Sequence, residues 1–192
     1  AIGASLPVTE PVGTMIVDIG GGTTEVAVLS LGGTVVSESL RIAGDEINDS
    51  ISSYLKKNHG LAVGERTAEK IKIKIGSAFP DDNFDNTPFE VRGLHLASGL
   101  PRSITLTSGE IREAMSDPLN KIVEAVKRTL ERTPPELAAD IVDRGIMLAG
   151  GGALVRGISD LLSDETGIFA HIAENPLLCV VNGCGEVLDD FK

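Results

Sequence analysis

The stretch Asp18-Ile19-Gly20-Gly21-Gly22-Thr23-Thr24-Glu25 lies between two short apolar runs and organises the rest of the chain. The runs 15–17 and 26–29 predict two short buried strands, and the three glycines between them predict a tight turn. Glycine permits positive φ and has no side chain. Several backbone N–H groups can therefore point into one concavity, which suits a phosphate.

Three side chains beside this turn are candidates for phosphate chemistry. Thr23 and Thr24 would add hydroxyl donors. The Asp18 carboxylate would repel a phosphate, so its position makes sense if a Mg²⁺ ion lies between them, held largely through water. The alternative is an ordinary glycine-rich hairpin with an exposed aspartate. The stretch is not a Walker loop, because no Gly-Lys-Ser/Thr follows it.

Composition limits the class of protein. The chain has 192 residues, 42% of them hydrophobic and 23% charged, which predicts a folded domain. A net charge of −11 without a basic run argues against nucleic acid and against direct contact with an anionic membrane surface. The sequence shows no signal peptide and no apolar run of membrane-spanning length. Cys179 and Cys184 are read as free thiols of a reducing cytosol, and the chain, which begins without Met, as a fragment.

The segment after the turn predicts a three-stranded meander followed by a helix. Gly32-Gly33 would form a hairpin leading into a strand at 34–42. Gly44-Asp45 would then open a helix with Asp45 as its N-cap. The two residues would be either a second approach to a nucleotide or a plain cap.

The segment 65–75 carries conflicting patterns. Apolar and charged residues alternate at 71–75 as in a strand, but Thr67-Ala68-Glu69-Lys70 favours a helix, and we predict a helix. Glu69 and Lys72 are three residues apart and would share one face of it. This pair could hold a ribose hydroxyl and the adenine or its sugar. The alternative is a surface ion pair.

The second half predicts a small strand pair and several helices. The strands are expected at 89–92 and 103–107, with a long connection between them. Ser108 would cap a short helix, and a separate longer helix would start at Asp117-Pro118. A last helix, capped by Asn175-Pro176, would turn one apolar face to the core: Leu177, Val181, Cys184 and Leu188. We expect all apolar faces to be covered within residues 1–192.

A second glycine motif follows a buried strand at 145–149. Gly150-Gly151-Gly152 leads into residues 153–161, whose apolar positions have helical spacing. A strand, a triple glycine and a helix are typical of a phosphate or purine site, since the helix N-terminus favours an anion. The alternative is a turn that needs glycine for packing alone.

Together these residues resemble a known superfamily. The motif at 18–25 resembles the second phosphate motif of the actin and DnaK-chaperone ATPases, and the motif at 145–154 resembles their adenosine motif. Within the superfamily the chain is most similar to the MreB family, the bacterial actins. Six connecting stretches narrow the resemblance from the superfamily to the MreB family: 3–8, 41–45, 64–69, 75–78, 134–137 and 164–167. Ala43 departs from the family, which commonly has a second glycine there.

The resemblance implies an α/β fold that is the second lobe of an actin-like ATPase. Subdomain IIA, a mixed sheet with flanking helices, would comprise residues 1–43 and 107–192. Subdomain IIB, a small inserted α+β unit, would comprise residues 44–106. The first lobe, with its phosphate loop and catalytic acid, would be missing, so we expect the parent protein to be a slow ATPase and the isolated chain to be inactive.

The resemblance also assigns roles to individual residues. Asp18 would orient Mg²⁺ and its waters, and Thr23 and Thr24 would hold phosphate or the attacking water. The remaining residues would bind the nucleotide. Its phosphates would accept hydrogen bonds from the N–H groups of Gly20, Gly21 and Gly22, and its ribose and base would be held by Glu69 and Lys72. Its adenosine would lie against the residues of the second glycine motif: Gly150, Gly151, Gly152, Ala153 and Leu154.

The function that follows is that of an ATP-dependent, filament-forming protein of the bacterial cell-shape machinery. The resemblance implies self-association of the full-length protein and a RodZ-like membrane adaptor docked on subdomain IIA. It also implies a place in the cytoplasm, at the inner face of the membrane. Two alternatives share the glycine motifs: a lobe of a DnaK-type chaperone, and a phosphotransferase similar to sugar or acetate kinases.

Overall fold

The computed structural model describes residues 1–190 and contains two β-sheets. The larger sheet has the strand order β3-β2-β1-β7-β8. Its strands are β1 (Thr14–Ile19), β2 (Thr24–Ser30), β3 (Gly33–Leu40), β7 (Ile146–Ala149) and β8 (Ala170–Ile172). The first three form the predicted antiparallel meander, whereas β1, β7 and β8 run parallel. The sheet is therefore mixed, as expected.

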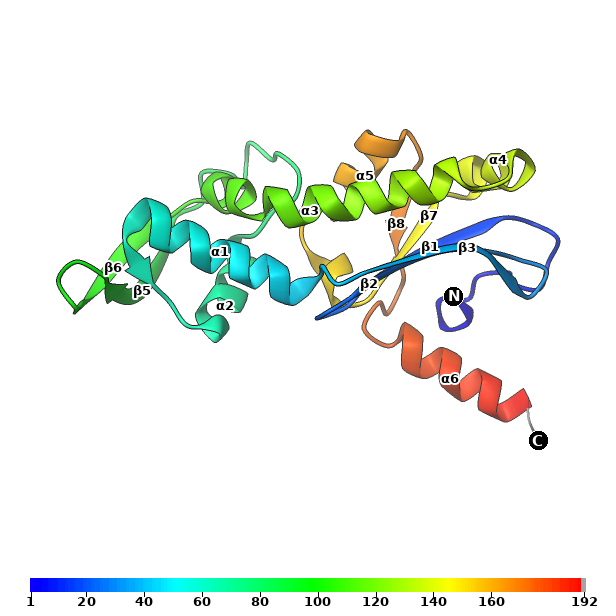
Figure 1. The fold of residues 1–192 in the computed structure, drawn as a ribbon, viewed down its shortest axis with the longest axis horizontal. Helices are drawn as coiled ribbons and strands as arrows, with labels where there is room; N and C mark the ends of the chain where they lie inside the picture. The colour runs from blue at the N-terminus through cyan, green and yellow to red at the C-terminus, as the bar shows by residue number, and fades with distance from the viewer. Residues whose placement is uncertain (191–192) are drawn as a thin grey trace.

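Strand β1 is covered on both faces. Met15, Val17 and Ile19 belong to the main core, whereas Ile16 belongs to a smaller cluster on the opposite face. Figure 1 shows α3 (Ser108–Glu131), α4 (Pro135–Arg144) and α5 (Ile158–Thr166) on one side of the sheet, and α6 (Cys179–Asp190) on the other. Alternation along the strand puts Asp18 on the same face as Ile16.

The smaller sheet lies at the other end of the molecule, beside α1 (Gly44–His59) and α2 (Glu65–Ile75) (Figure 1). Its order is β4-β5-β6, formed by β4 (Leu61–Ala62), β5 (Phe89–His95) and β6 (Leu100–Leu106). The helix predicted at 65–75 is confirmed. The long connection predicted between the two later strands is wrong, because Gly93 continues β5 and pairs with Arg102. A Cβ atom at Gly93 would lie 2.5 Å from the Ala62 carbonyl oxygen, so glycine lets β4 pack closely there.

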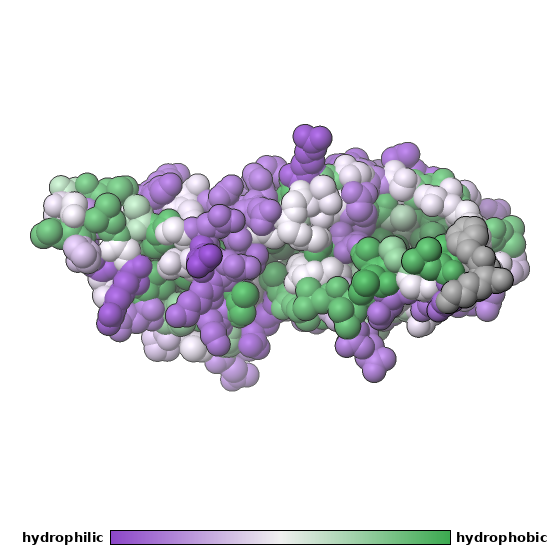
Figure 2. All heavy atoms as spheres, turned by 90° about the horizontal axis from the view of Figure 1, so that it is seen from below, coloured by the Kyte–Doolittle hydropathy of each residue, from purple (hydrophilic) through white to green (hydrophobic). Residues whose placement is uncertain are grey.

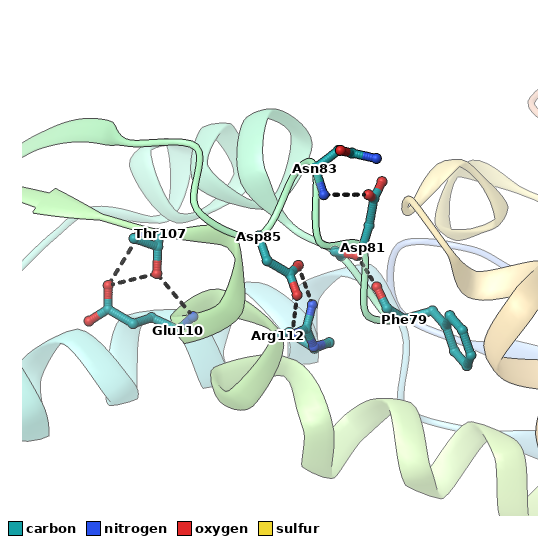
Figure 3. Close-up of polar contacts among 8 residues, drawn as sticks. Phe79, Asp81, Asn83, Asp85, Thr107, Glu110 and Arg112 are labelled. Atoms are coloured by element: carbon teal, nitrogen blue, oxygen red, sulfur yellow. Dashed lines mark hydrogen bonds and ion pairs between the residues drawn. The ribbon is translucent and has the colours of Figure 1, made fainter.

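Helix α3 is one continuous helix of 24 residues, so the prediction of two helices was wrong. Thr107, not Ser108, is its N-cap: Thr107 and Glu110 form a capping box in which each side chain bonds the other residue's backbone N–H (Figure 3). Pro118 lies inside the helix and removes one backbone donor. The helix continues because its apolar face is buried on both sides of the proline, by Met115 before it and Leu119 after it.

The acidic loop 79–88 between α2 and β5 is fixed at two points. Arg112 of α3 donates two hydrogen bonds, of 2.5 and 2.6 Å, to the Asp85 carboxylate (Figure 3). This contact lowers the pKa of Asp85 below its usual range. The Arg156 guanidinium lies 3.8 Å from the centre of the Phe84 ring. The loop therefore connects the inserted segment to α3 and to the segment before α5.

The last part of the chain differs from prediction in two places. The second glycine motif leads into a short 3-10 helix, η2 (Gly151–Leu154), and not directly into α5. Gly157, with φ +72°, is the N-cap of α5 and separates that helix from η2.

Helix α6 is the second difference, because most of its predicted core face is exposed. The helix begins at Cys179, so Leu177 lies before it. Leu177, Val181 and Leu188 are 61–66% exposed. Among the α6 side chains that the structure describes, Cys179 alone is buried, in the cluster with Ile16, and Cys184 is exposed. Figure 2 shows apolar side chains gathered on this side of the molecule. The expectation that residues 1–192 cover every apolar face was therefore wrong. Among residues 1–190, no helix combines the length and apolarity needed to cross a membrane.

Candidate functional site

The carboxyl ends of β1 and β7 open into a cavity of about 440 Å³. The two strands are adjacent and parallel, so both glycine motifs lie at the same edge of the sheet. The cavity brings together seven residues predicted from the sequence: Gly20, Gly21, Glu69, Lys72, Gly151, Gly152 and Leu154. Six predicted residues are not among those that line it: Asp18, Gly22, Thr23, Thr24, Gly150 and Ala153.

The turn 20–23 is held against the start of α1 by backbone hydrogen bonds. The Gly44 N–H donates to the Gly20 carbonyl at 3.1 Å, and the Asp45 N–H donates to the Gly21 carbonyl at 2.8 Å. The glycines at 20–22 do not adopt positive φ, so the turn does not use that freedom of glycine. The tight position is Gly20, where a Cβ atom would lie 3.1 Å from the Thr23 carbonyl oxygen, whereas a Cβ atom at Gly21 would make an ordinary contact of 3.8 Å with the Asp45 carboxylate.

Asp45 was predicted to be the N-cap of α1, and this prediction was wrong, because the N-cap is Ala43. Asp45 instead lies in the first turn of the helix, and both it and Gly44 line the cavity. Their N–H groups are used on the glycine turn, which explains why the helix begins here without a side-chain cap. The structure thus supports a cavity role for Gly44-Asp45 over a plain cap.

The hydroxyl of Thr24 does not face the cavity. Thr24 is fully buried, and its Oγ1 donates to the Ile42 carbonyl at 2.7 Å. Thr23 is exposed at the turn. Of the two threonines, Thr23 is therefore the one whose hydroxyl is accessible to a ligand.

Asp18 is half-buried at the end of β1, beside the second glycine motif. A Cβ atom at Gly150 would lie 2.4 Å from the Asp18 Oδ1 atom. Burial disfavours the charged form, and it raises the pKa of Asp18 above the usual aspartate range. A nearby cation would relieve this cost.

The three glycines of the second motif have different reasons to be glycine. Gly150 has φ +81°, and a Cβ atom there would lie 2.3 Å from the Ile19 carbonyl oxygen. A Cβ atom at Gly152 would lie 2.2 Å from the Ile19 Cγ2 atom. At Gly151 the only close neighbour would be the Leu177 Cδ2 atom, at 3.3 Å. The first and third glycines therefore pack against β1. Gly151 and Gly152 both line the cavity, but only at Gly151 would an added Cβ atom avoid β1.

Lys72 turns inward from α2. Its Nζ donates to the Gly44 carbonyl at 3.0 Å, and burial lowers the pKa of Lys72, against the opposing effects of Glu69 and Asp45. Glu69 lines the same cavity but is exposed. The pair therefore faces the cavity rather than forming a simple surface ion pair.

Sequence reasoning missed six cavity residues: Ile47, Asn48, Ile73, Val155, Arg156 and Leu177. Asn48 had a readable signal, because it follows Gly44 by one helical turn and shares its face. The other five depend on how the separate segments pack together, which local patterns do not show.

The whole chain, residues 1–192, matches the family model described as MreB/Mbl protein. It is 55% identical over 189 residues to the cell shape-determining protein MreB of Escherichia coli K12, covering 98% of this chain and 54% of that protein. It is 48% identical to the cell shape-determining protein Mbl of Bacillus subtilis, covering 100% of this chain and 57% of that protein. The chain thus spans about half the length of these relatives.

Solved structures agree with this match. The crystal structure of MreB5 of Spiroplasma citri bound to ADP superposes with a TM-score of 0.95 at 38% identity, covering 100% of this chain and 57% of that one. The MamK double helical filament superposes with a TM-score of 0.76 at 22% identity, covering 92% and 54%, which supports the actin-like fold alone. The chain belongs to the MreB/Mbl family.

Proposed function

We propose that this chain is the ATP-binding second lobe of a filament-forming, MreB-like actin that organises cell-wall synthesis and rod shape. The observation that carries the proposal is the cavity at the ends of β1 and β7, where both glycine motifs meet Lys72. The relatives named MreB and Mbl are cell shape-determining proteins, and MreB5 has been solved with ADP and with AMPPNP. Family membership favours this function over a chaperone lobe or a phosphotransferase.

The proposed subdomains follow the two sheets. The larger sheet takes its strands from segments 1–43 and 107–192, which we assign to subdomain IIA. The smaller sheet lies within 44–106, which we assign to subdomain IIB. The cavity takes residues from both parts, and the Arg156–Phe84 contact and the Asp85–Arg112 ion pair also join them.

The N–H groups of Gly21 and Gly22 would bind the phosphates, since the Gly20 N–H already donates to the Thr23 carbonyl at 2.9 Å. Gly151 and Leu154 would lie against adenosine. Asp18 suits a Mg²⁺ ion bound through water, since it is a single half-buried carboxylate with a raised pKa. Within residues 1–190 no cluster of three acidic, His or Cys side chains offers a direct metal site. Mg²⁺ would neutralise charge on the phosphates while water attacks the γ-phosphate in line.

Assembly of the full-length protein tests this function. With ATP and Mg²⁺ we expect filaments in the pellet after sedimentation and in electron micrographs, and we expect none without nucleotide. The 192-residue chain alone should stay in the supernatant and turn over little ATP, because positioning from the opposite side of the nucleotide is lost. A full-length protein that binds ATP but never assembles would contradict the filament function.

We further propose that the protein acts in the cytoplasm at the inner membrane face, tethered by a RodZ-like adaptor on subdomain IIA. Calorimetry against the cytoplasmic helix-turn-helix domain of such an adaptor should show saturable binding. Glu90→Lys, at an exposed position of β5 in subdomain IIB, should leave this affinity unchanged. Loss of binding in that variant, or no binding by the parent, would refute the placement.

A further inference from the structure

Asn48 is a cavity residue with an unsatisfied polar atom. It lies on α1, is only 4% exposed, and lines the cavity. Its Oδ1 atom is buried from solvent and has no hydrogen-bond partner within the described residues 1–190, so the amide must rotate before this atom can reach a ligand in the cavity. Buried side-chain acceptors are nearly always bonded, so an orphan acceptor beside a cavity indicates a donor that does not belong to the chain.

The position of Asn48 limits which part of a nucleotide can reach it. Gly44, one helical turn earlier, donates to the Gly20 carbonyl and so lies against the proposed phosphate turn. Four residues along an α-helix correspond to about 6 Å. Asn48 is therefore farther from the phosphate turn than Gly44 is, at the depth where a nucleotide carries its ribose.

The chemistry of the amide oxygen narrows the choice further. An acceptor is repelled by phosphate oxygens and needs a donor such as a hydroxyl. The Lys72 ammonium uses one of its three N–H donors on the Gly44 carbonyl and makes no hydrogen bond to the Asn48 Oδ1 atom. Rotation about the Cβ–Cγ bond of asparagine has broad, shallow preferences, so the amide can turn its oxygen toward a ligand that enters the cavity.

We propose that Asn48 accepts a hydrogen bond from a ribose hydroxyl of the bound nucleotide and so selects ribonucleotides over dideoxynucleotides. This inference rests on the proposed function, because it takes the cavity to be the ATP site. It adds a contact from α1 to those proposed for Glu69 and Lys72 with the ribose and base. A neutral hydrogen bond of this kind corresponds to about a three- to tenfold difference in affinity.

The test is a thermodynamic cycle in the full-length protein that combines one substitution in the protein with one change in the ligand. The dissociation constants of ATP and 2′,3′-dideoxy-ATP are measured for the wild type and for Asn48→Leu. Leucine has a similar size and removes the orphan acceptor, so this variant should fold with an unchanged or higher melting temperature. We expect the preference for ATP over the dideoxy analogue to fall by about three- to tenfold in the variant.

Asn120→Leu is the matched control, since Asn120 is an exposed asparagine on α3. It should keep the wild-type preference. If Asn48→Leu also keeps that preference, or lowers the melting temperature while keeping it, Asn48 is a structural residue and the inference is wrong. A variant that discriminates normally at the ribose but loses the distinction between ATP and its 6-deamino analogue would likewise overturn the ribose assignment. Failure of the wild type to bind ATP at all would instead refute the proposed function.

Discussion

Asp18→Asn should lower the ATP turnover of the full-length protein by on the order of 100-fold, the size typical of losing one preorganised electrostatic contribution. The substitution keeps the shape of the side chain and removes its charge. The affinity for nucleotide should change much less, because the phosphates would still meet the N–H groups of Gly21 and Gly22. Steady-state phosphate release and a titration with a fluorescent ATP analogue measure the two effects separately.

Glu25→Gln is the control for this experiment. Glu25 pairs with Asp18 across β1 and β2, so its side chain lies on the same face of the sheet. Glu25 is exposed, and its carboxylate accepts a hydrogen bond from Ser39 at 2.7 Å. Near-wild-type turnover in Glu25→Gln beside a large loss in Asp18→Asn would show that position matters, and not charge alone. Equal turnover in all three proteins would remove Asp18 from the mechanism.

The raised pKa of Asp18 adds a pH dependence to this prediction. Turnover should fall as the pH decreases through that pKa, because the protonated carboxyl no longer attracts Mg²⁺, and Asp18→Asn should lack this step. The effect on stability has the opposite sign. Since the folded-state pKa lies above the unfolded value, ionised Asp18 costs folding free energy at higher pH, and the cost disappears as the pH falls through the folded pKa. Asp18→Asn should therefore melt no lower than the wild type near neutral pH.

Local patterns were enough to predict most elements and both glycine motifs. The meander and the helix at 65–75 follow from apolar spacing and are confirmed. The juxtaposition of the motifs depends on the parallel pairing of β1 with β7, which lie more than a hundred residues apart in the chain. No local signal gives that pairing, so the sequence predicted two glycine turns without showing that they share one edge of a sheet.

The errors also have physical causes. Thr107-Ser108-Gly109-Glu110 carries the capping-box spacing, which identifies Thr107 as the cap. Pro118 looked like a helix start because proline favours that position, but burial on both sides of it outweighs one lost hydrogen bond.

Helix α6 shows a different limit. An amphipathic pattern indicates that a face is apolar, and it does not indicate what covers that face. In this chain the side chains of Leu177, Val181 and Leu188 remain exposed. Although it is exposed, Leu177 lines the cavity beside Gly151.

The glycines at 151 and 152 give the second large prediction, because adjacent substitutions should have opposite consequences. Gly152→Val should destabilise the fold by about 1–3 kcal/mol, the usual cost of overpacking, and lower the melting temperature by about 2–12 °C for a chain of this size. The new Cβ atom would lie 2.2 Å from the Ile19 Cγ2 atom and 3.0 Å from the Ile19 carbonyl oxygen. Ile19 is fixed at the end of β1, so neither atom can move away freely.

Gly151→Ala should leave the melting temperature nearly unchanged and weaken ATP binding severalfold. Its Cβ atom would touch only the Leu177 side chain, at 3.3 Å, and an exposed leucine can rotate away. The added methyl group would still narrow the cavity where adenosine is proposed to lie. Thermal melts and ATP titrations of both variants in the full-length protein decide the matter. Wild-type affinity in a well-folded Gly151→Ala protein would mean that this glycine, like Gly150 and Gly152, serves packing, and that adenosine does not approach the backbone there.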